Sequence, residues 1–268
     1  RAARTLHRAL AGKTVTGFRS MLPKLNRVDE DSPVVGRTIE SVESRGKWLL
    51  FTFSGDLLLL THMLMNGSWH IYRQGERWQR SASQMRIVLE TNDFVAVGFS
   101  VPVAEFHDSH SLARREGFSS LGQDVLSPEF DEGAAKAALL ARPETEVGVA
   151  LLTQSLLAGI GNVFKSEICF ACHVHPARNI SSLTEGELQC LVRTARKQLA
   201  SNVTPAAGDA IVTYTGMRRT TGRSDPAARV WVYGRRGDPC RRCGTAIEAF
   251  KQQPGARTTF FCPKCQTR

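Results

Sequence analysis

Four cysteines near the C-terminus constrain the fold more than any other feature of this sequence. They form two Cys-x-x-Cys pairs, Cys240 with Cys243 and Cys262 with Cys265, and 18 residues separate the pairs. Each pair folds back on itself so that two thiolates converge, and this spacing is typical of a tetrahedral four-thiolate zinc site. Because protein thiolates fill all four positions, the predicted zinc ion is structural. Disulfides are the alternative, and they require an oxidising compartment.

The cysteines define a small C-terminal module, residues 229–268. A segment this short is not stabilised by burial alone, so zinc binding has to supply the missing folding free energy. Between the two pairs we expect a β-hairpin with strands at Glu248–Lys251 and Thr258–Phe261 and a turn at Gln253–Ala256. Arg257 adjoins this turn, where its guanidinium could grip a phosphate in a forked geometry; a merely solvated arginine is the alternative.

The positive charge of the chain is concentrated in the same module. The formal net charge is +10. Between Arg229 and Arg268, nine Lys and Arg are balanced only by Asp238 and Glu248, which places +7 of the charge in the last forty residues. Such a density favours a nucleic-acid partner, because neutralising phosphates releases their counterions. A basic surface that serves only solubility is the alternative, and the absence of a cationic amphipathic helix argues against a membrane surface.

The remainder of the chain reads as a strand-rich half followed by a helical half. Residues 2–11 have apolar residues on one helical face, and a polar connection follows Gly12. Several short strands at regular spacing then predict a sandwich or a barrel. The predicted strands are Trp48–Phe53, Leu57–His62, Trp69–Tyr72, Met85–Glu90 and Phe94–Phe99. The predicted helices are Ala134–Leu140, Glu146–Leu157, Asn162–Phe170 and Thr184–Leu199, the last opened by a Thr184-x-x-Glu187 capping box.

A double-glycine turn joins two of the predicted helices. Gly159 and Gly161 allow a close approach of the backbone, and we expect Asn162 to cap the helix that follows. The unpaired N–H groups at the start of that helix suit a phosphate. A plain helical hairpin is the alternative for this turn.

A second group of cysteines and histidines follows in the same region. It consists of Cys169, Cys172, His173 and His175. We interpret the two thiols as packing residues at the end of a helix, with a second metal site as the alternative. No apolar run is long enough for a membrane span, and we expect a cytoplasmic protein.

Short motifs spread over nearly the whole chain carry one resemblance. In chain order they are Gly46-Lys47, His62-x-x-Met65-x-Gly67, Leu121-Gly122-x-Asp124-Val125-Leu126, Gly159-Ile160-Gly161-Asn162, Glu167, His175-Pro176, Val232-Tyr233-Gly234-Arg235 and Gly255-x-Arg257-x-Thr259-x-x-Cys262-Pro263-x-Cys265-Gln266. In this order, and with four correctly spaced cysteines, the chain resembles the formamidopyrimidine-DNA glycosylase and endonuclease VIII family.

The resemblance implies an α+β multidomain fold with three parts. These are an N-terminal β-sandwich at residues 1–125, a helix–two-turn–helix domain at 126–228 and a zinc-finger hairpin at 229–268. It also implies a monomer of bacterial type, associated with the nucleoid, that binds damaged DNA between its halves and extrudes the damaged nucleotide. The segment 202–228 reads as a long loop, ordered or mobile, with little periodicity.

The same resemblance assigns roles to four residues. Met65 resembles the wedge that fills the space left by the extruded nucleotide, and Asn162 and Arg257 resemble the phosphate clamp beside the lesion. Lys47 resembles the lysine that contacts phosphate and assists elimination, and Arg257 lies at the same reacting centre. A core methionine and an exposed strand lysine are the alternatives for Met65 and Lys47.

Two departures refine these expectations. Members of the formamidopyrimidine branch usually carry an Arg-x-Phe insertion loop, whereas this chain has residues 97–102 in its place. This difference favours the endonuclease VIII branch. The expected substrates are then oxidised pyrimidines, or lesions in single-stranded regions. The family's nucleophilic N-terminal proline and its neighbouring glutamate are missing, because Arg1 falls inside the first helix. We therefore expect the chain as printed to bind but not to cleave DNA, as a fragment of an active enzyme.

Other functions are compatible with parts of this pattern. A natural member without catalytic activity would be a damage-binding protein of the same architecture. An RNA-binding zinc-ribbon protein of the translation machinery would explain the basic module and the cysteines, but it leaves the strand-rich half unused.

Overall fold

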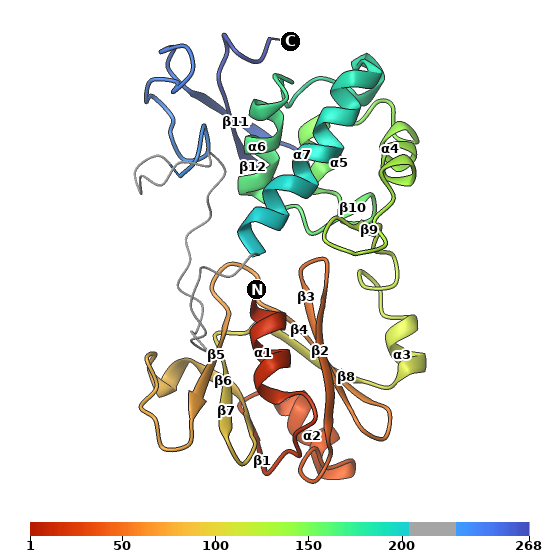
Figure 1. Cartoon of the computed structure of the whole chain (residues 1–268), viewed down its shortest axis with the longest axis vertical. Coiled ribbons are helices and arrows are strands. Elements are labelled where there is room, and N and C mark those ends of the chain that lie inside the picture. The colour runs from red at the N-terminus through yellow and green to blue at the C-terminus, as the bar shows by residue number, and fades with distance from the viewer. Residues whose placement is uncertain (204–228, 268) are drawn as a thin grey trace. The chain divides into compact units, whose positions relative to one another are not determined.

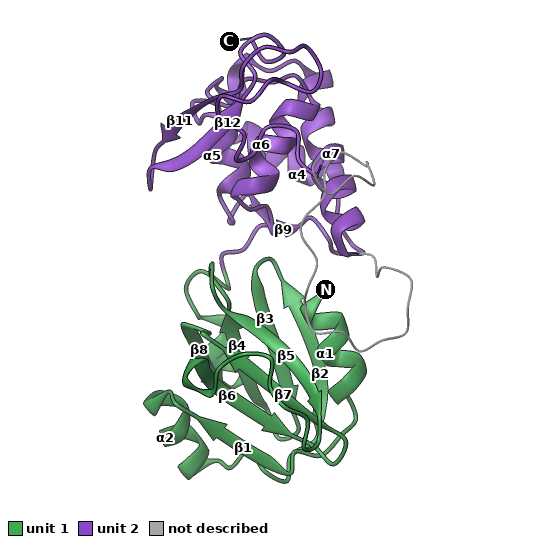
Figure 2. Ribbon diagram, turned by 90° about the vertical axis from the view of Figure 1, so that its left-hand side faces the viewer, with its two compact units in different colours: residues 1–119, 205–216 green, residues 120–204, 217–268 purple. Residues whose placement is uncertain are grey.

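The computed structural model describes residues 1–203 and 229–267. Residues 1–119 form one compact unit, and residues 120–203 together with 229–267 belong to a second (Figures 1 and 2). The loop expected at 202–228 lies outside the described residues, apart from its first two positions, which end a helix. None of the helices in the described ranges combines the length and the apolar character needed to cross a bilayer.

The first unit contains two four-stranded antiparallel sheets. One has the strand order β1-β6-β7-β5 and the other β2-β3-β4-β8. The strands are β1 (Gly17–Ser20), β2 (Ile39–Arg45), β3 (Trp48–Phe53), β4 (Leu57–His62), β5 (Ser68–Arg73), β6 (Met85–Glu90), β7 (Phe94–Phe99) and β8 (Val103–His107). The N-terminal β-sandwich is therefore confirmed, and the five predicted strands are present almost residue for residue.

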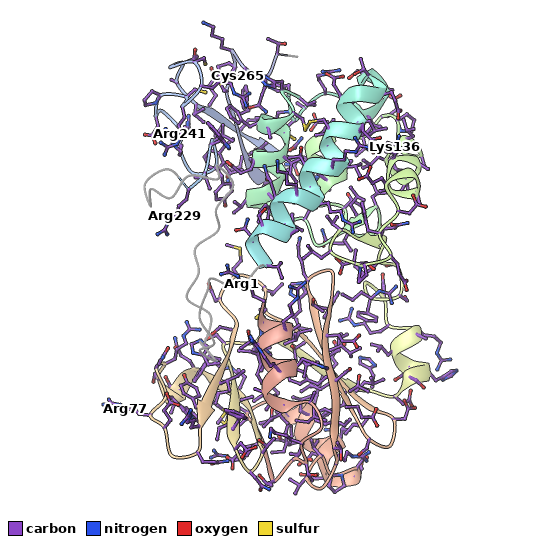
Figure 3. All side chains as sticks on the ribbon, in the orientation of Figure 1. Arg1, Arg77, Lys136, Arg229, Arg241 and Cys265 are labelled. Carbon is purple, nitrogen blue, oxygen red and sulfur yellow. A yellow bond between two sulfur atoms is a disulfide. The ribbon has the colours of Figure 1, made fainter. Side chains whose placement is uncertain are left out.

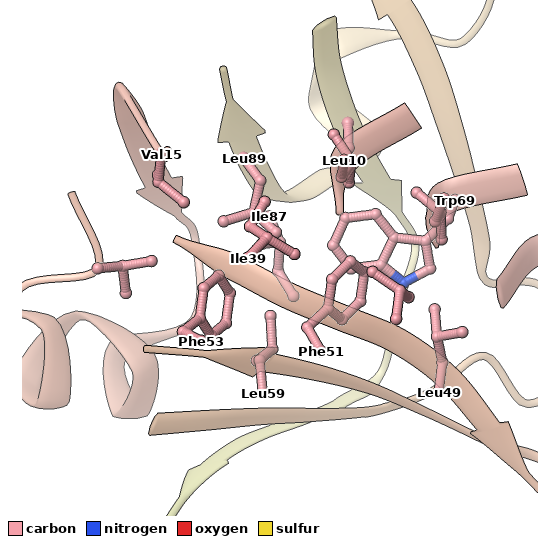
Figure 4. Packing of buried hydrophobic residues seen from close by; sticks show 14 of the residues in the cluster. Leu10, Val15, Ile39, Leu49, Phe51, Phe53, Leu59, Trp69, Ile87 and Leu89 are labelled. Carbon is pink, nitrogen blue, oxygen red and sulfur yellow. The ribbon is translucent and has the colours of Figure 1, made fainter. Parts of the chain in front are cut away.

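One apolar core fills the space between these two sheets. Along β3 every second side chain is buried, as expected of a strand with one face on a core. Phe51, Phe53 and Leu59 of one sheet pack with Trp69 and Leu89 of the other (Figure 4). The predicted N-terminal helix, α1 (Ala2–Leu10), buries four of its side chains in the same core.

The segment expected to be a polar connection is structured, so that prediction was wrong. It contains β1 and helix α2 (Pro23–Asp31), which starts with a proline at its first turn. Leu25 is the one residue of α2 that is fully buried, so its sequence has almost no apolar periodicity. Strand β8, the 3-10 turn η1 (Ala82–Gln84) and the short helix α3 (Ser109–Ala113) were also absent from the sequence-based prediction.

The second unit is helical. It contains α4 (Glu132–Leu140), α5 (Val147–Leu152), α6 (Asn162–Ala171), the 3-10 turn η2 (Ile180–Ser182), α7 (Glu185–Val203) and the two-residue strands β9 (Gln123–Asp124) and β10 (Leu157–Ala158). The capping box at the start of α7 is confirmed. The N–H of Thr184 donates to Glu187 Oε2 at 2.8 Å, and the N–H of Glu187 donates to Thr184 Oγ1 at 3.2 Å.

The predicted helix Glu146–Leu157 is too long. Helix α5 ends at Leu152, and β10 then pairs in parallel with β9. The N–H of Gly122 donates to the carbonyl of Gln154 at 2.9 Å, and a Cβ on Gly122 would lie 2.4 Å from the carbonyl oxygen of Leu156. This backbone contact replaces the helical hydrogen bonds after Leu152, which local periodicity could not reveal.

The C-terminal module is the predicted hairpin. Strands β11 (Glu248–Gln252) and β12 (Arg257–Phe261) pair antiparallel around the expected turn. The module packs against α6 through a cluster of buried apolar residues. The members of that cluster are Phe170, Val232, Cys240, Ile247 and Cys262.

The second group of cysteines does not form a metal site. Cys172 at the end of α6 is joined by a disulfide to Cys190 of α7, which corrects its interpretation as a packing thiol. Cys169 is a free, fully buried thiol, as expected of a packing residue. His173 is exposed and His175 is buried against aromatic rings.

Candidate metal centre and nucleic-acid interface

The four cysteines of the C-terminal module converge on one point. Their Sγ atoms all lie within 4.8 Å of one another, with 4.0 Å between those of Cys240 and Cys265 and 3.5 Å between those of Cys243 and Cys262. A tetrahedral zinc ion with Zn–S bonds of about 2.3 Å separates its sulfur ligands by about 3.8 Å. The residues present therefore fit one structural zinc ion, and among residues 1–203 and 229–267 they form the one group suited to hold a metal.

The backbone around the cysteines is held by hydrogen bonds that the sequence did not reveal. The N–H of Arg242 points at Cys240 Sγ at 3.4 Å. Gln266, which is fully buried, accepts the N–H of Cys262 at 2.9 Å and donates from Nε2 to the carbonyl of Val174 at 2.9 Å. The glutamine of the Cys-Pro-x-Cys-Gln motif thus ties the zinc site, marked by Cys265 in Figure 3, to the exit of α6.

One face of α6 contacts strand β12 through three polar side chains. Asn162 Nδ2 donates to the carbonyl of Thr258 at 3.0 Å. One turn later, Lys165 Nζ donates to the hydroxyl of Thr259. The hydroxyl of Ser166 accepts the N–H of Phe260 at 3.3 Å. These contacts fix the register of the hairpin on the helix.

Asn162 does not cap α6, so the predicted capping role is wrong. The N-cap residue is Gly161, with φ −111° and ψ 175°, and no side chain caps the helix. Asn162 occupies the first helical position, and its amide turns to the backbone of β12 instead. Within the described residues its Oδ1 is buried without a hydrogen-bond partner.

Arg257 is the first residue of β12 and is exposed. It pairs with Gln252 across the hairpin and directly precedes Thr258, the residue whose carbonyl Asn162 contacts. Its positive charge also contributes to lowering the pKa of Lys165. The structure thus brings Asn162 and Arg257 together at one end of the contact between α6 and β12, as the predicted phosphate clamp requires.

Met65 lies at the tip of the loop between β4 and β5. Its side chain is 85% exposed, so the alternative of a core methionine is wrong. Two contacts shape the loop: the backbone N–H of Leu64 donates to the ring of His62 at Nδ1, at 3.0 Å, and the backbone approaches itself so closely at Gly67 that a Cβ there would lie 2.6 Å from the carbonyl oxygen of Met63. A tight backbone therefore presents an apolar side chain to solvent, which is what a wedge requires.

Lys47 lies in the turn between β2 and β3, directly after Gly46, whose φ is +60°. Burial, followed by the charges of Lys47 and Arg115, lowers the pKa of His62. Lys47 and the base of the Met65 loop therefore share one electrostatic environment. A neutral His62 ring is available to accept the N–H of Leu64.

Glu167 of α6 has a structural role that the sequence did not reveal. It is fully buried in α6, and its carboxylate accepts the N–H groups of Trp231, Val232 and Tyr233 at 2.7, 2.9 and 2.9 Å. Glu167 was one of the motif residues that carried the resemblance, but nothing in the sequence indicated which groups its carboxylate would bind. It fastens the start of the C-terminal module to α6.

Three family models match the chain in succession. They are the formamidopyrimidine-DNA glycosylase N-terminal domain over residues 1–111, the formamidopyrimidine-DNA glycosylase H2TH domain over 121–213, and the zinc finger found in FPG and IleRS over 237–268. A protein of Streptomyces coelicolor named probable endonuclease 8 2 is 38% identical over 268 residues, covering 99% of this chain and 91% of its own length. The chain belongs to the formamidopyrimidine-DNA glycosylase and endonuclease VIII family.

Within the formamidopyrimidine-DNA glycosylase and endonuclease VIII family, the chain lies near the endonuclease VIII-like members. Endonuclease 8 2 of Mycobacterium bovis is 35% identical, covering 98% of this chain and 96% of its own length. The formamidopyrimidine-DNA glycosylase of Exiguobacterium sibiricum is 31% identical, covering 98% and 95%. The family models also account for the strand-rich half, which the zinc-ribbon interpretation left unused.

Solved structures of other proteins have the same fold as this chain. The Lactococcus lactis Fpg in complex with DNA containing an abasic site superposes with a TM-score of 0.79 at 22% identity, covering all of this chain and 97% of that one. The fold is thus the family's β-sandwich, helix–two-turn–helix and zinc-finger architecture, with one structural zinc ion.

Proposed function

We propose that this protein is a base-excision-repair DNA glycosylase with abasic-site lyase activity on oxidised bases, pyrimidines above all. The observation that supports the proposal is the hydrogen bond from Asn162 at the start of α6 to the carbonyl of Thr258, the residue that directly follows the exposed Arg257 in the hairpin. Helix starts and exposed arginines both bind phosphate, and at this position both are available to one stretch of DNA backbone. We expect the protein to carry out this activity at the bacterial nucleoid.

Each proposed site residue has a physical task in this reaction. Extruding a nucleotide costs a few kcal/mol of unstacking, and the exposed side chain of Met65 offsets part of that cost by filling the space left in the stack. Asn162 and Arg257 hold the backbone beside the lesion. Lys47 contacts a phosphate near the reacting sugar and helps elimination.

The resemblance implies a reaction through a Schiff base. A proline amine attacks C1′ of the sugar, the base leaves, and the resulting Schiff base undergoes elimination, with the neighbouring glutamate moving protons. Lys47, Met65, Asn162 and Arg257 bind, kink and position the DNA.

The test uses borohydride trapping. The full-length gene product, incubated with a duplex that contains an abasic site and with borohydride, should form a covalent protein–DNA product. A full-length protein that binds damaged DNA but is never trapped would reject the lyase and leave the non-catalytic damage-binding protein as the function.

A substitution at Arg257 tests the phosphate clamp. Arg257→Ala should weaken binding to abasic-site duplexes about tenfold, at all flanking sequences, because it removes a charged hydrogen bond to phosphate. The slope of log affinity against log salt concentration should fall by about one. Fluorescence anisotropy titrations at several salt concentrations measure both quantities.

Arg236 provides the matched control for this substitution. It is an exposed arginine of the same module that lies outside both strands of the hairpin. Arg236→Ala lowers the net charge equally and should change affinity about twofold or less. An unchanged salt slope in Arg257→Ala would remove Arg257 from the clamp.

A further inference from the structure

A lysine is buried beneath the proposed phosphate clamp. Lys165 lies in α6, one helical turn after Asn162, and its relative exposure is 0%. Its Nζ donates to the hydroxyl of Thr259 on β12. Within residues 1–203 and 229–267 no carboxylate forms an ion pair with it. Buried lysines normally have such a partner, so this one requires an explanation.

A chain of hydrogen bonds leads from Lys165 through two neutral side chains to a carboxylate. Thr259 Oγ1 donates in turn to Gln252 Oε1 at 2.9 Å. Gln252 Nε2 then donates to Glu146 Oε2 at 2.7 Å and to the carbonyl of Pro176 at 2.9 Å. The nearest acid along this path is therefore separated from the amine by two uncharged side chains.

The titratable groups around Lys165 supply no anion either. Cys169, one turn further along α6, has its pKa raised to about 12 by burial and is a neutral thiol at neutral pH. Arg257 on β12 has the same sign of charge as Lys165. On the other neighbouring segments, Glu146 at the start of α5 is reached only through Gln252, and His175 stacks between aromatic rings.

These surroundings disfavour the charged amine in the protein without DNA. Burial lowers the pKa of Lys165 to about 8. The next largest effect, from Cys169, opposes this, and the charge of Arg257 adds a smaller lowering effect. At neutral pH the amine is still mostly protonated. Within residues 1–203 and 229–267, this buried positive charge thus has no carboxylate as an ion-pair partner, and the buried carboxylate of Glu167 in the same helix accepts the N–H groups of residues 231–233 instead.

We propose that a DNA backbone phosphate bound by Asn162 and Arg257 is the missing counter-ion of Lys165, which makes Lys165 a third cationic group of the phosphate site, acting from inside the protein. Asn162, Lys165 and Arg257 belong to the same contact between α6 and β12. Attraction between a phosphate and a buried amine is screened less than attraction between exposed charges. The inference rests on the proposed function, because it takes DNA as the ligand.

Binding should consequently be coupled to the protonation of Lys165. A nearby phosphate favours the charged amine and raises the pKa of Lys165 in the complex. Above about pH 8 the complex then holds more protons than the free protein does, so affinity falls as the pH rises. A single coupled proton reduces affinity by up to about tenfold per pH unit in this window.

The experiment compares the chain with its Lys165→Met variant. Methionine has a similar length and no charge, and Thr259 keeps its hydrogen bond to Gln252. Both proteins are titrated with a duplex containing a tetrahydrofuran abasic-site analogue, from about pH 6.5 to about 9.5 at constant ionic strength. At pH 7 the variant should bind about tenfold more weakly, and the two affinities should converge as the pH rises.

Lys251→Met is the matched control. Lys251 also donates to a threonine of the hairpin, at 2.8 Å to Thr258 Oγ1, but it is exposed on β11. Its loss should shift affinity by a similar factor at every pH and leave the shape of the pH profile unchanged. A difference between the two variants therefore reports the buried position, not the lost charge alone.

Thermal unfolding without DNA gives a second readout. Because the folded state lowers the pKa of Lys165, the unfolded chain binds more protons between about pH 8 and the ordinary lysine value, and removing the charge stabilises the fold at pH 7. Lys165→Met should therefore raise the melting temperature while it weakens DNA binding. A lysine with a purely structural role would lower the melting temperature on removal.

The possible outcomes distinguish the counter-ion role proposed for Lys165 from the proposed glycosylase function. Parallel pH profiles for the chain and for Lys165→Met would overturn the counter-ion role and leave the glycosylase proposal intact. A lower melting temperature of the variant at pH 7 would also overturn it. Failure of the unsubstituted chain to bind abasic-site DNA at any pH would overturn both.

Discussion

Replacing Cys262 by alanine is expected to unfold the C-terminal hairpin and to reduce DNA binding by more than about a hundredfold. Cys262 is fully buried, and its Sγ is one of the four that converge on the zinc position. Structural zinc ions contribute about 10–16 kcal/mol to small domains of this kind, far more than the apolar cluster behind the hairpin can replace. The hairpin carries Arg257, so the proposed phosphate clamp should be lost with it.

Zinc content, circular dichroism and DNA affinity together test this expectation. The metal-to-protein ratio should fall from one to near zero, with loss of strand signal and of binding. Cys169→Ala is the matched control, because Cys169 is equally buried but lies in α6 outside the zinc site. It should retain zinc and DNA binding. A Cys262 variant that keeps its hairpin and its affinity would contradict the structural role of the metal.

The second large effect is expected at Glu167. Glu167→Ala removes the acceptor of three backbone N–H groups, those of residues 231–233, and should lower the free energy of unfolding by about 4 kcal/mol. That loss is a large part of the 5–15 kcal/mol by which domains of this size are typically stable. Urea unfolding measures it. DNA affinity should fall in parallel, since the hairpin module loses its attachment to α6.

Two further variants calibrate the Glu167 result. Glu167→Gln keeps one carbonyl oxygen as an acceptor and should lose about half as much stability. Glu185→Ala removes an exposed carboxylate that pairs with Lys136, and this should change the unfolding free energy by less than about 1 kcal/mol. Equal, small losses for Glu167→Ala and Glu185→Ala would show that the three N–H groups find other partners.

Features with a local signature were predictable from the sequence. Short apolar runs between turn residues predicted the strands β3, β4, β6 and β7, and the cysteine spacing predicted both the zinc site and the hairpin. Strand β1 was missed because it is four residues long and its pairing partner, β6, lies about 70 residues further along the chain. Nothing local distinguishes such a strand from a loop.

The errors at the candidate site have the same origin. Asn162 has the local features of a helix cap, but its amide is used by Thr258, which is 96 residues away in sequence. The disulfide between Cys172 and Cys190 depends on the packing of α6 against α7, and the role of Glu167 depends on a segment 64 residues later. Long-range packing decides among roles that short motifs leave open.

In the loop at Met65, the residues that fix the backbone conformation are not the residue whose side chain is exposed at the tip. The conformation of the loop depends on the hydrogen bond from Leu64 to the His62 ring and on the close backbone approach at Gly67, while the side chain of Met65 takes no part in the core. The residue at the tip can therefore be exchanged without cost to folding. The side chain that the loop presents to solvent can thus change while the β-sandwich that carries the loop stays the same.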